Sequence, residues 1–256
     1  MKASLVITDV TRMQEGRVCI AGYTRQGKCI RPVMPPPGIH ERTLYSQGRV
    51  MVFPFAVVEY DLLQQVPQPP HTEDCRYDPT SVRFVERLDE KRKRVVLDKT
   101  LFPDVKTIFE APVYSDYGYY IMEGQGPRSL GTVRPQQVTH TIHELSPEEK
   151  WSYRLVFVDG EGSTYRLTVT DLAWRYYHDH QRQIGQEPKE ISSGLTSMLK
   201  SSQVYLRIGL ARGWEKFPDR CFIQITGVYT FPDYLNGRTF ADLAPGPDGQ
   251  VKWQST

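Results

Sequence analysis

Cationic and aromatic side chains gather in two parts of this chain, and together they could bind a polyanion that carries flat bases. Single-stranded nucleic acid is held by cations that neutralise its phosphates and by rings that stack on its bases. Arg31 precedes Pro32, so its backbone is held extended and its guanidinium group can aim in one direction. The first group consists of Arg12, Arg17, Tyr23, Arg25, Lys28 and Arg31.

The second group lies near the other end of the chain. Arg207 and Arg212 bracket Gly209, and Tyr229 follows in the next apolar run. These arginines could hold phosphates as the first group does, while Tyr23 and Tyr229 could stack on bases. The two groups therefore predict binding of single-stranded RNA or DNA on two basic faces.

Each basic group also has a structural interpretation. Exposed arginines and lysines are common, so the first group could be the solvated side of an edge hairpin. Arg207 and Arg212 could each form an ion pair with Asp219 or Asp233. The sequence leaves both interpretations open.

A third cluster contains residue types that bind metals. His71, Glu73 and Asp74 follow a proline-rich stretch, and His140 and His143 could join them in the fold. Such a site would suit a metal-dependent hydrolase or nuclease. Zinc sites need three or four protein ligands at defined spacing, however, and the cluster has no partner of that kind. We therefore expect a turn or helix cap here, no metal site and no cofactor.

Two further segments have ordinary alternatives. Tyr114, Tyr117, Tyr119 and Tyr120 could form a stacking surface on a loop, or a loop that covers the core. The basic run from Lys91 to Arg94 follows two acidic residues, which reduce its positive field, so we expect it at the solvated turn of a hairpin.

Motifs typical of enzymes are missing from the sequence. It contains no glycine-rich phosphate loop, nucleophile elbow, HExxH helix or paired Cys-x-x-Cys zinc motif. The sequence therefore favours a binding protein over an enzyme. The alternative to a nucleic-acid partner is a protein partner. In that case the protein would be an adaptor that binds a partner enzyme, and the arginines and tyrosines would lie in the interface.

Composition limits the size of any polyanion site. The 256 residues include 32 basic and 30 acidic ones, a net charge of +2, so such a site must be a local patch. The four cysteines are scattered, and the first apolar run is too short for a signal sequence or a membrane span. These features predict a cytoplasmic protein without a membrane partner.

Short apolar runs separated by glycine and proline predict a mainly β protein with little helix. We expect a small barrel over residues 1–66, a mixed connecting segment over 67–147 and a second barrel over 148–240, followed by a frayed tail over 241–256. Asp159-Gly-Glu-Gly162 predicts a hairpin turn, and a helix should begin at residue 170 or 171 and continue to about 182.

Several segments resemble the dual OB domain-containing proteins, an uncharacterised bacterial and archaeal family. They are Arg17-Val-Cys-Ile-Ala-Gly22, Gly27-Lys-Cys-Ile-Arg-Pro-Val33, Pro70-His-Thr-Glu-Asp74, Ser129-Leu-Gly131, Gly209-Leu-Ala-Arg212 and Gly227-Val-Tyr-Thr-Phe-Pro-Asp-Tyr-Leu235. The resemblance implies two oligonucleotide-binding-type barrels and no established activity. Family members often have tryptophan at the positions of Cys29 and Cys75, so two possible stacking rings are absent from this chain.

Overall fold

The first barrel is built from amphipathic strands whose apolar side chains alternate with polar ones. In the computed structural model, which describes residues 1–245, Leu5, Ile7, Ile20, Ile30 and Val58 point into its core and are at most 3% exposed. Its strands are β1 (Lys2–Arg12), β2 (Arg17–Thr24), β3 (Cys29–Val33), β7 (Ala56–Gln65) and β8 (Asp74–Tyr77).

These five strands close into a ring in the order β1-β2-β3-β8-β7, with β7 returning to β1. The pair β3–β8 is parallel and the other pairs are antiparallel. One further strand, β9 (Arg83–Arg87), extends the sheet beyond β7. The short elements that connect the strands are η1 (Gln14–Gly16), β4 (Ile39–His40), η2 (Glu41–Leu44), β5 (Tyr45–Ser46), β6 (Arg49–Val50) and η3 (Pro79–Ser81).

The second barrel repeats this arrangement with a longer first strand that is interrupted at residues 134–136. The two halves of that strand pair separately, the first with β17 and the second with β15. A parallel bridge between Val169 and Ile225 joins the third strand to the fifth. The strands are β13 (Leu130–Val133), β14 (Gln137–Leu145), β15 (Trp151–Val158), β16 (Thr164–Thr168), β17 (Gln203–Leu210) and β18 (Arg220–Phe231).

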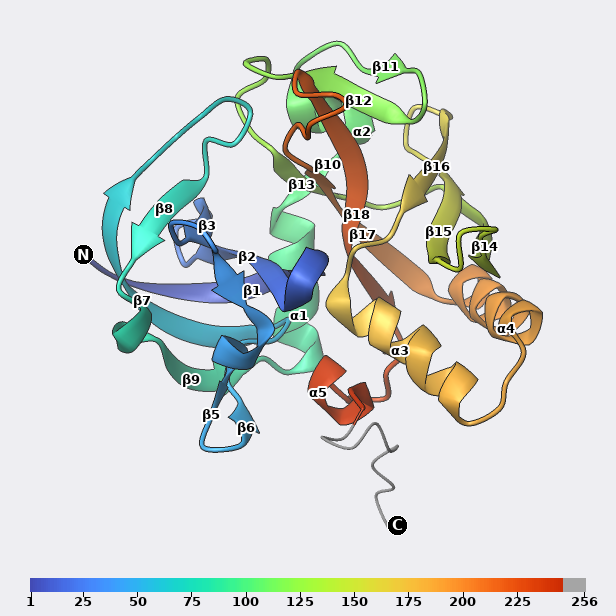
Figure 1. Ribbon diagram of the computed structural model, residues 1–256, viewed down its shortest axis with the longest axis horizontal. Coiled ribbons are helices and arrows are strands. Elements are labelled where there is room, and N and C mark those ends of the chain that lie inside the picture. The colour runs from blue at the N-terminus through green and yellow to red at the C-terminus, as the bar shows by residue number, and fades with distance from the viewer. Residues whose placement is uncertain (246–256) are drawn as a thin grey trace.

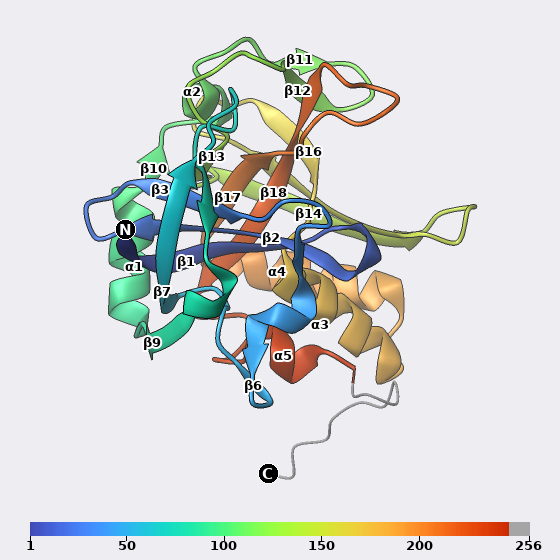
Figure 2. The same cartoon turned by 60° about the vertical axis from the view of Figure 1, so that its left-hand side comes forward.

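Both rings therefore have the strand order 1-2-3-5-4 when strands are counted along the chain. The predicted mainly β architecture with two small barrels is confirmed, and so is the hairpin of β15 and β16. Figures 1 and 2 show the two barrels packed against each other, with β1 to β9 on one side and β13 to β18 on the other.

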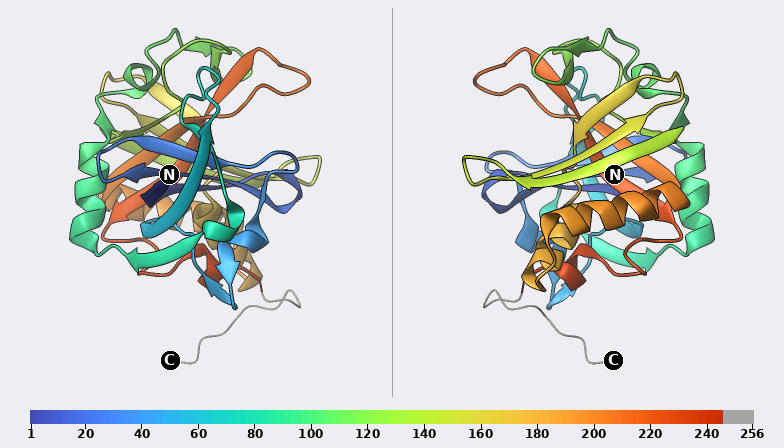
Figure 3. Two further views of the ribbon diagram at one scale, coloured as in Figure 1. Left: turned by 90° about the vertical axis from the view of Figure 1, so that its left-hand side faces the viewer. Right: turned by 90° about the vertical axis from the view of Figure 1, so that its right-hand side faces the viewer.

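Two helices lie between the third and fourth strands of the second barrel, α3 (Leu172–Gln183) and α4 (Pro188–Ser201). Asp171 caps α3, because its Oδ1 accepts hydrogen bonds from the amides of Ala173 and Trp174. The predicted helix is thus present, and α4, which the sequence analysis did not anticipate, packs along β14. Figure 3 shows both helices crossing the lower part of the molecule.

The middle of the chain contributes to both sheets. The strand β9 is followed by the helix α1 (Glu90–Lys99), so the basic run from Lys91 to Arg94 lies in a helix and not at the tip of a hairpin. The remaining elements of this part are β10 (Leu101–Phe102), α2 (Val105–Phe109), β11 (Tyr114–Ser115) and β12 (Tyr119–Met122). Residues 67–147 therefore include β8 and β9 of the first barrel's sheet, β10 to β13 of the six-stranded sheet and β14 of the three-stranded sheet.

The expected tail over residues 241–256 begins inside a short helix, α5 (Phe240–Leu243). Residues 246–256 of this tail lie outside the described part of the chain.

None of the helices within residues 1–245 combines the length and the apolar character that a bilayer span requires.

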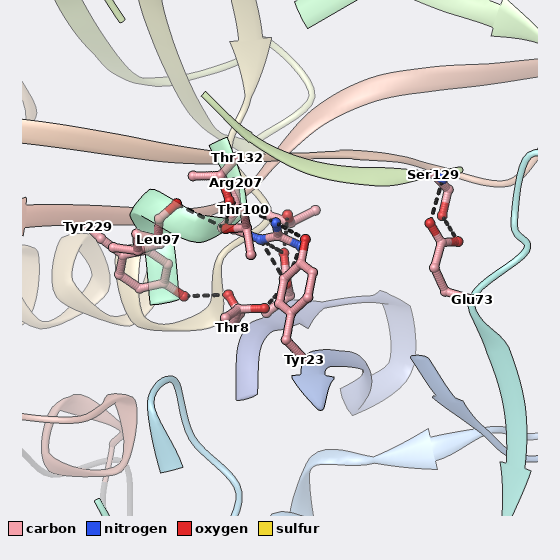
Figure 4. Close-up of polar contacts among 11 residues, drawn as sticks. Thr8, Tyr23, Glu73, Leu97, Thr100, Ser129, Thr132, Arg207 and Tyr229 are labelled. Atoms are coloured by element: carbon pink, nitrogen blue, oxygen red, sulfur yellow. Dashed lines mark hydrogen bonds and ion pairs between the residues drawn. The ribbon is translucent and has the colours of Figure 1, made fainter. Parts of the chain in front are cut away.

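A fully buried ion pair joins the two barrels. Arg207 on β17 is 0% exposed, and its Nε and Nη2 lie 3.0 and 2.9 Å from Oδ2 of Asp9 on β1. Its Nη1 donates hydrogen bonds of 2.9 Å to Tyr23 Oη and to Thr132 Oγ1 (Figure 4). The Thr226 hydroxyl donates to Asp9 Oδ1. Two charges are thus removed from water as an ion pair in which Nε and Nη1 of Arg207 donate hydrogen bonds, whereas Nη2 makes only the ionic contact with Asp9 among the described residues.

Other polar contacts also join the two barrels. Tyr229 Oη donates to the carbonyl of Thr8, and the Glu73 carboxylate accepts from the amide and hydroxyl of Ser129, each at 2.8 Å (Figure 4). Thr72 Oγ1 donates to the carbonyl of Pro127. The β7–β8 loop of the first barrel, residues 66–73, is therefore bound to the second barrel.

Arg207→Met should strongly destabilise the protein, because it leaves the Asp9 carboxylate buried without its cation. The expected loss in the free energy of unfolding is about 3–5 kcal/mol, measured by urea denaturation. Arg154→Met, at an exposed arginine of β15, is the matched control and should change stability by less than about 0.5 kcal/mol. A loss of less than about 1 kcal/mol in Arg207→Met would show that the pair does not hold the barrels together.

Candidate nucleic-acid interface

The outward side of β2 and β3 faces the second barrel and not solvent. Tyr23, on β2, accepts the hydrogen bond from Arg207, and burial raises the pKa of its phenol, so the ring stays neutral. Arg31, on β3, is 5% exposed, and its Nε donates to Oδ1 of Asp74 at 2.6 Å. Tyr23, Arg31 and Arg207 therefore lie between the barrels, where a nucleic acid has no access to them.

The predicted residues that remain accessible lie at the surface around β2. Arg25 and Lys28 are exposed in the β2–β3 turn and form no ion pair with any described residue. Arg17 is one-third exposed and lies 3.3 Å from the Glu15 carboxylate. Within residues 1–245, these three cations share no ion-pair partner with Arg207 or Arg212.

Arg207 on β17 and Arg212 just after it form ion pairs, as the structural interpretation allowed, but with other partners. Arg207 binds Asp9, and Arg212, which is half exposed, binds Asp74 together with Arg31. Both partners lie on the first barrel and not at Asp219 or Asp233. The sequence could not reveal these pairs because the partners are far apart along the chain.

Tyr229 also contacts the first barrel, through both its hydroxyl group and its ring. Its hydroxyl donates to the first barrel, and its ring packs edge to face on Phe55, with 4.6 Å between centroids. The first barrel therefore engages both its hydroxyl group and its ring, and Tyr229 is not part of an open basic face.

Two of the possible metal ligands bind other protein groups, and the third, His71, is buried. Glu73 binds Ser129, and Asp74 binds two arginines. Within residues 1–245, no three histidine, cysteine or acidic side chains are arranged to hold a metal ion. His71 is 3% exposed, and neither of its ring nitrogens has a hydrogen-bond partner among the described residues.

Aromatic side chains gather at one end of the second barrel, on the β11–β12 turn and the β17–β18 loop. Tyr117 is 85% exposed, Trp214 53% and Tyr114 42%. Phe217 lies between the two segments, with its ring centroid 6.0 Å from Tyr117 and 5.6 Å from Trp214. We call this surface the aromatic tip; it consists of Tyr114, Tyr117, Tyr120, Trp214, Lys216, Phe217, Arg220 and Phe222.

The backbone of both loops keeps these rings outside the core. Trp214 and Phe217 exchange backbone hydrogen bonds of 3.2 and 2.7 Å, which close the loop on itself. Gly213 permits this, since a Cβ there would lie 2.0 Å from the carbonyl oxygen of Pro218. Tyr117 has a φ of 54° at the turn between β11 and β12. Figures 2 and 3 show the β17–β18 loop, in orange, projecting beside β11 and β12.

Cations lie over the faces of these rings. The Lys216 ammonium is 5.4 Å from the centroid of Phe217 and 5.9 Å from that of Tyr117. Arg220 lies 4.6 Å from the rings of Tyr120 and Phe217, and it also pairs with Asp116 at 3.2 Å. Lys216 has no carboxylate within 4 Å among the described residues, so it is available to a phosphate.

Only part of this surface was predictable from the sequence. Of the tyrosines from 114 to 120, which could form a stacking surface or cover the core, Tyr114 and Tyr117 are exposed. Trp214, Lys216 and Phe217 were not among the predicted site residues. The sequence feature that could have indicated them is the segment from Gly213 to Phe217, which places two aromatic residues and a lysine between two strand-like runs.

The model of the dual OB-containing domain family matches residues 4–228, and the chain belongs to this family. No curated protein matches the chain. OB barrels bind oligonucleotides on their second and third strands and in the loops after the first and fourth strands. In the first barrel those strands and the later loop, residues 66–73, face the second barrel. In the second barrel the corresponding loop, β17–β18, carries the aromatic tip.

The buried His71 predicts a pH dependence of stability. Burial, together with the charges of Arg31 and Arg212, lowers its pKa to about 2. The unfolded ring gains a proton below pH 6.5 while the folded ring stays neutral, so stability falls as the pH decreases below 6.5. His178 has a pKa lowered to about 3 and adds to this effect.

His71→Gln should therefore reduce the acid-side slope of unfolding free energy by about 1.4 kcal/mol per pH unit between pH 6 and 4. Urea denaturation at each pH gives this slope, which is separate from any constant loss of stability. His140→Gln, at an exposed histidine, should leave the slope unchanged. An unaltered slope in His71→Gln would contradict a neutral His71 in the folded state.

Proposed function

We propose that this dual-OB protein binds single-stranded nucleic acid through the aromatic tip of its second barrel. The observation that supports this most is the exposure of Tyr117 and Trp214 beside the unpaired Lys216 ammonium. Large aromatic rings are normally buried, because their exposure to water forgoes the free energy of burial. A loop that holds two of them outward therefore favours a contact with a partner.

The chemistry of the tip suits unpaired bases. A base can stack on an accessible ring only when it is not already stacked in a duplex, and each such contact contributes about 1–3 kcal/mol. Lys216 and Arg220 place positive charge over the same rings, where the phosphates that flank a stacked base would lie. We therefore expect preference for a single strand over a duplex.

The position of the tip agrees with ligand binding by OB barrels. It lies on the loop after the fourth strand of the second barrel, which is one of the ligand-binding loops of this fold. Arg212 begins the same loop and is half exposed, so it can contact a strand that leaves the tip. Arg25 and Lys28 of the first barrel are a separate and more distant pair of cations.

The small number of free cations predicts weak dependence on salt. Each phosphate contact contributes a slope of about −0.7 in a plot of log K against log salt for a single strand. With Lys216 free and the arginines of the tip partly paired, we expect a total slope between about −0.7 and −2. Stacking should therefore supply most of the affinity.

Trp214→Ala and Tyr117→Ala should each weaken binding of a labelled single-stranded oligonucleotide by about 5- to 150-fold, the equivalent of one lost stacking contact. Fluorescence anisotropy with single-stranded RNA, single-stranded DNA and duplex at two salt concentrations measures this. Lys216→Ala should reduce the salt slope by about 0.7.

Phe84→Ala is a matched control, since Phe84 is an exposed aromatic on β9 at 39%. It should leave affinity unchanged. Equal binding by the wild type and by Trp214→Ala would remove the tip from the site. A loss confined to the double variant Arg25→Ala, Lys28→Ala would place the contact on the first barrel instead. Salt-insensitive association with a protein and none with oligonucleotides would favour the adaptor role, because exposed tryptophan and tyrosine are also common interface residues.

A further inference from the structure

A cavity of about 310 Å³ lies at the opposite end of β18 from the aromatic tip. It is formed where the segment before β7, the helix α1 and the loop after β18 meet. Phe55, Tyr229 and Phe231 supply aromatic walls, and Lys93 and Asp233 supply charged groups. Its volume is at the lower end of the range for small-molecule sites in proteins.

Lys93 is a charged group of this cavity that forms no hydrogen bond with any residue in the described part of the chain. Its side chain is 14% exposed, and its ammonium lies 5.3 Å from the centroid of the Phe55 ring. The nearest carboxylate, Asp233, is 4.0 Å away, which is too long for a hydrogen bond. The two oxygens of Asp233 already accept hydrogen bonds from the amides of Leu235 and Gly237.

The neighbouring basic residues are neutralised by protein partners. Arg92 pairs with Glu86 and Asp89, and Arg94 pairs with Glu90, whose carboxylate is also on the cavity wall. Of the run from residue 91 to 94, Lys93 is thus the member that faces the cavity without a hydrogen bond among the described residues. Loss of hydration lowers its pKa, and an anion beside it would oppose that shift.

A smaller cavity of about 40 Å³ adjoins the first and shares four wall residues with it: Phe55, Lys93, Tyr229 and Asp233. Tyr234 also lines this inner cavity, and its buried hydroxyl has no hydrogen-bond partner within residues 1–245. Buried hydroxyl groups in proteins are nearly always hydrogen-bonded, and this volume is large enough for a water molecule or a small polar group. The inner cavity therefore offers a hydrogen-bonding position behind the aromatic walls.

We propose that these joined cavities bind a small anion that carries a flat ring, of the size of a nucleoside monophosphate. The anionic group would lie against Lys93 and the ring against Phe55 and Phe231. An anion fits better than a cation because Glu90 and Asp233 already accept hydrogen bonds from protein groups, whereas the Lys93 ammonium makes only a 4.0 Å ionic contact with Asp233 and donates no hydrogen bond to any described residue.

This site is separate from the proposed oligonucleotide site. The tip is at Arg220, where β18 begins, and the cavity is at Phe231, where it ends. At about 3.3 Å per residue the two ends are about 35 Å apart. The inference therefore does not depend on nucleic-acid binding by the tip.

Isothermal titration of the whole protein with AMP, GMP, CMP, UMP and inorganic phosphate tests the proposal. We expect saturable binding of at least one nucleoside monophosphate, and affinity at least tenfold lower in Lys93→Met. Lys91→Met is the matched control, because Lys91 is on the same helix but exposed, and Trp214→Ala controls for the tip. Both should bind the nucleotide as the wild type does.

Three outcomes would overturn the proposal: no saturable binding by any of the four nucleotides, equal binding by Lys93→Met, or inorganic phosphate binding as tightly as the nucleotides. Competition by a short oligonucleotide with a 5′-phosphate, but not by the same strand without it, would identify a strand end as the source of the bound nucleotide. Absence of such competition would identify the free nucleotide. Lys93→Met should also bind the single-stranded oligonucleotide as the wild type does. Loss of nucleotide binding in this variant would then be independent of oligonucleotide binding by the aromatic tip.

Discussion

The buried pair of Asp9 and Arg207 is the contact on which the arrangement of the two barrels depends. Removing two charges from water is costly, and the cost is offset only when the groups are paired and hydrogen-bonded. Here the partners come from β1 of one barrel and β17 of the other, with Tyr23, Thr132 and Thr226 completing the network. Neither charge could be buried in this way if its barrel stood alone. The two OB units are therefore one folding unit at this contact.

This docking decides which surfaces are left for function. The outward side of β2 and β3, which in OB barrels receives ligands, is covered in the first barrel by the second. The β7–β8 loop of the first barrel is bound through Glu73 and Thr72. The β17–β18 loop is bound to the first barrel at its start, through Arg212 and Asp74, but its end carries exposed rings such as Trp214. The two proposed sites consequently lie at the two ends of one strand, β18, with the aromatic tip at Arg220 and the small-anion cavity at Phe231.

Much of the fold was predictable from local sequence. Alternating apolar residues with glycine and proline between them predicted the strands, Asp159-Gly-Glu-Gly162 the hairpin, and the residues around Asp171 the start of α3. The resemblance to the dual OB family added that the two barrels are of the oligonucleotide-binding type. The site was predictable only in part. Arg31 and Arg207 were placed among phosphate-binding residues because arginine beside strand patterns has the same appearance whether it faces solvent or an ion-pair partner.

The sequence by itself determined the strands, the α3 cap and the family, because these depend on side-chain alternation and on short-range hydrogen bonds between residues close in the chain. Only the tertiary structure decided which charges are used internally and which remain available. Asp9 and Arg207 are 198 residues apart, and Asp74 and Arg212 are 138 apart. Trp214, by contrast, is exposed because the close approach of Gly213 to Pro218 turns its loop away from the barrel. Burial depends on what packs against a side chain from elsewhere in the chain, and no local pattern contains that information.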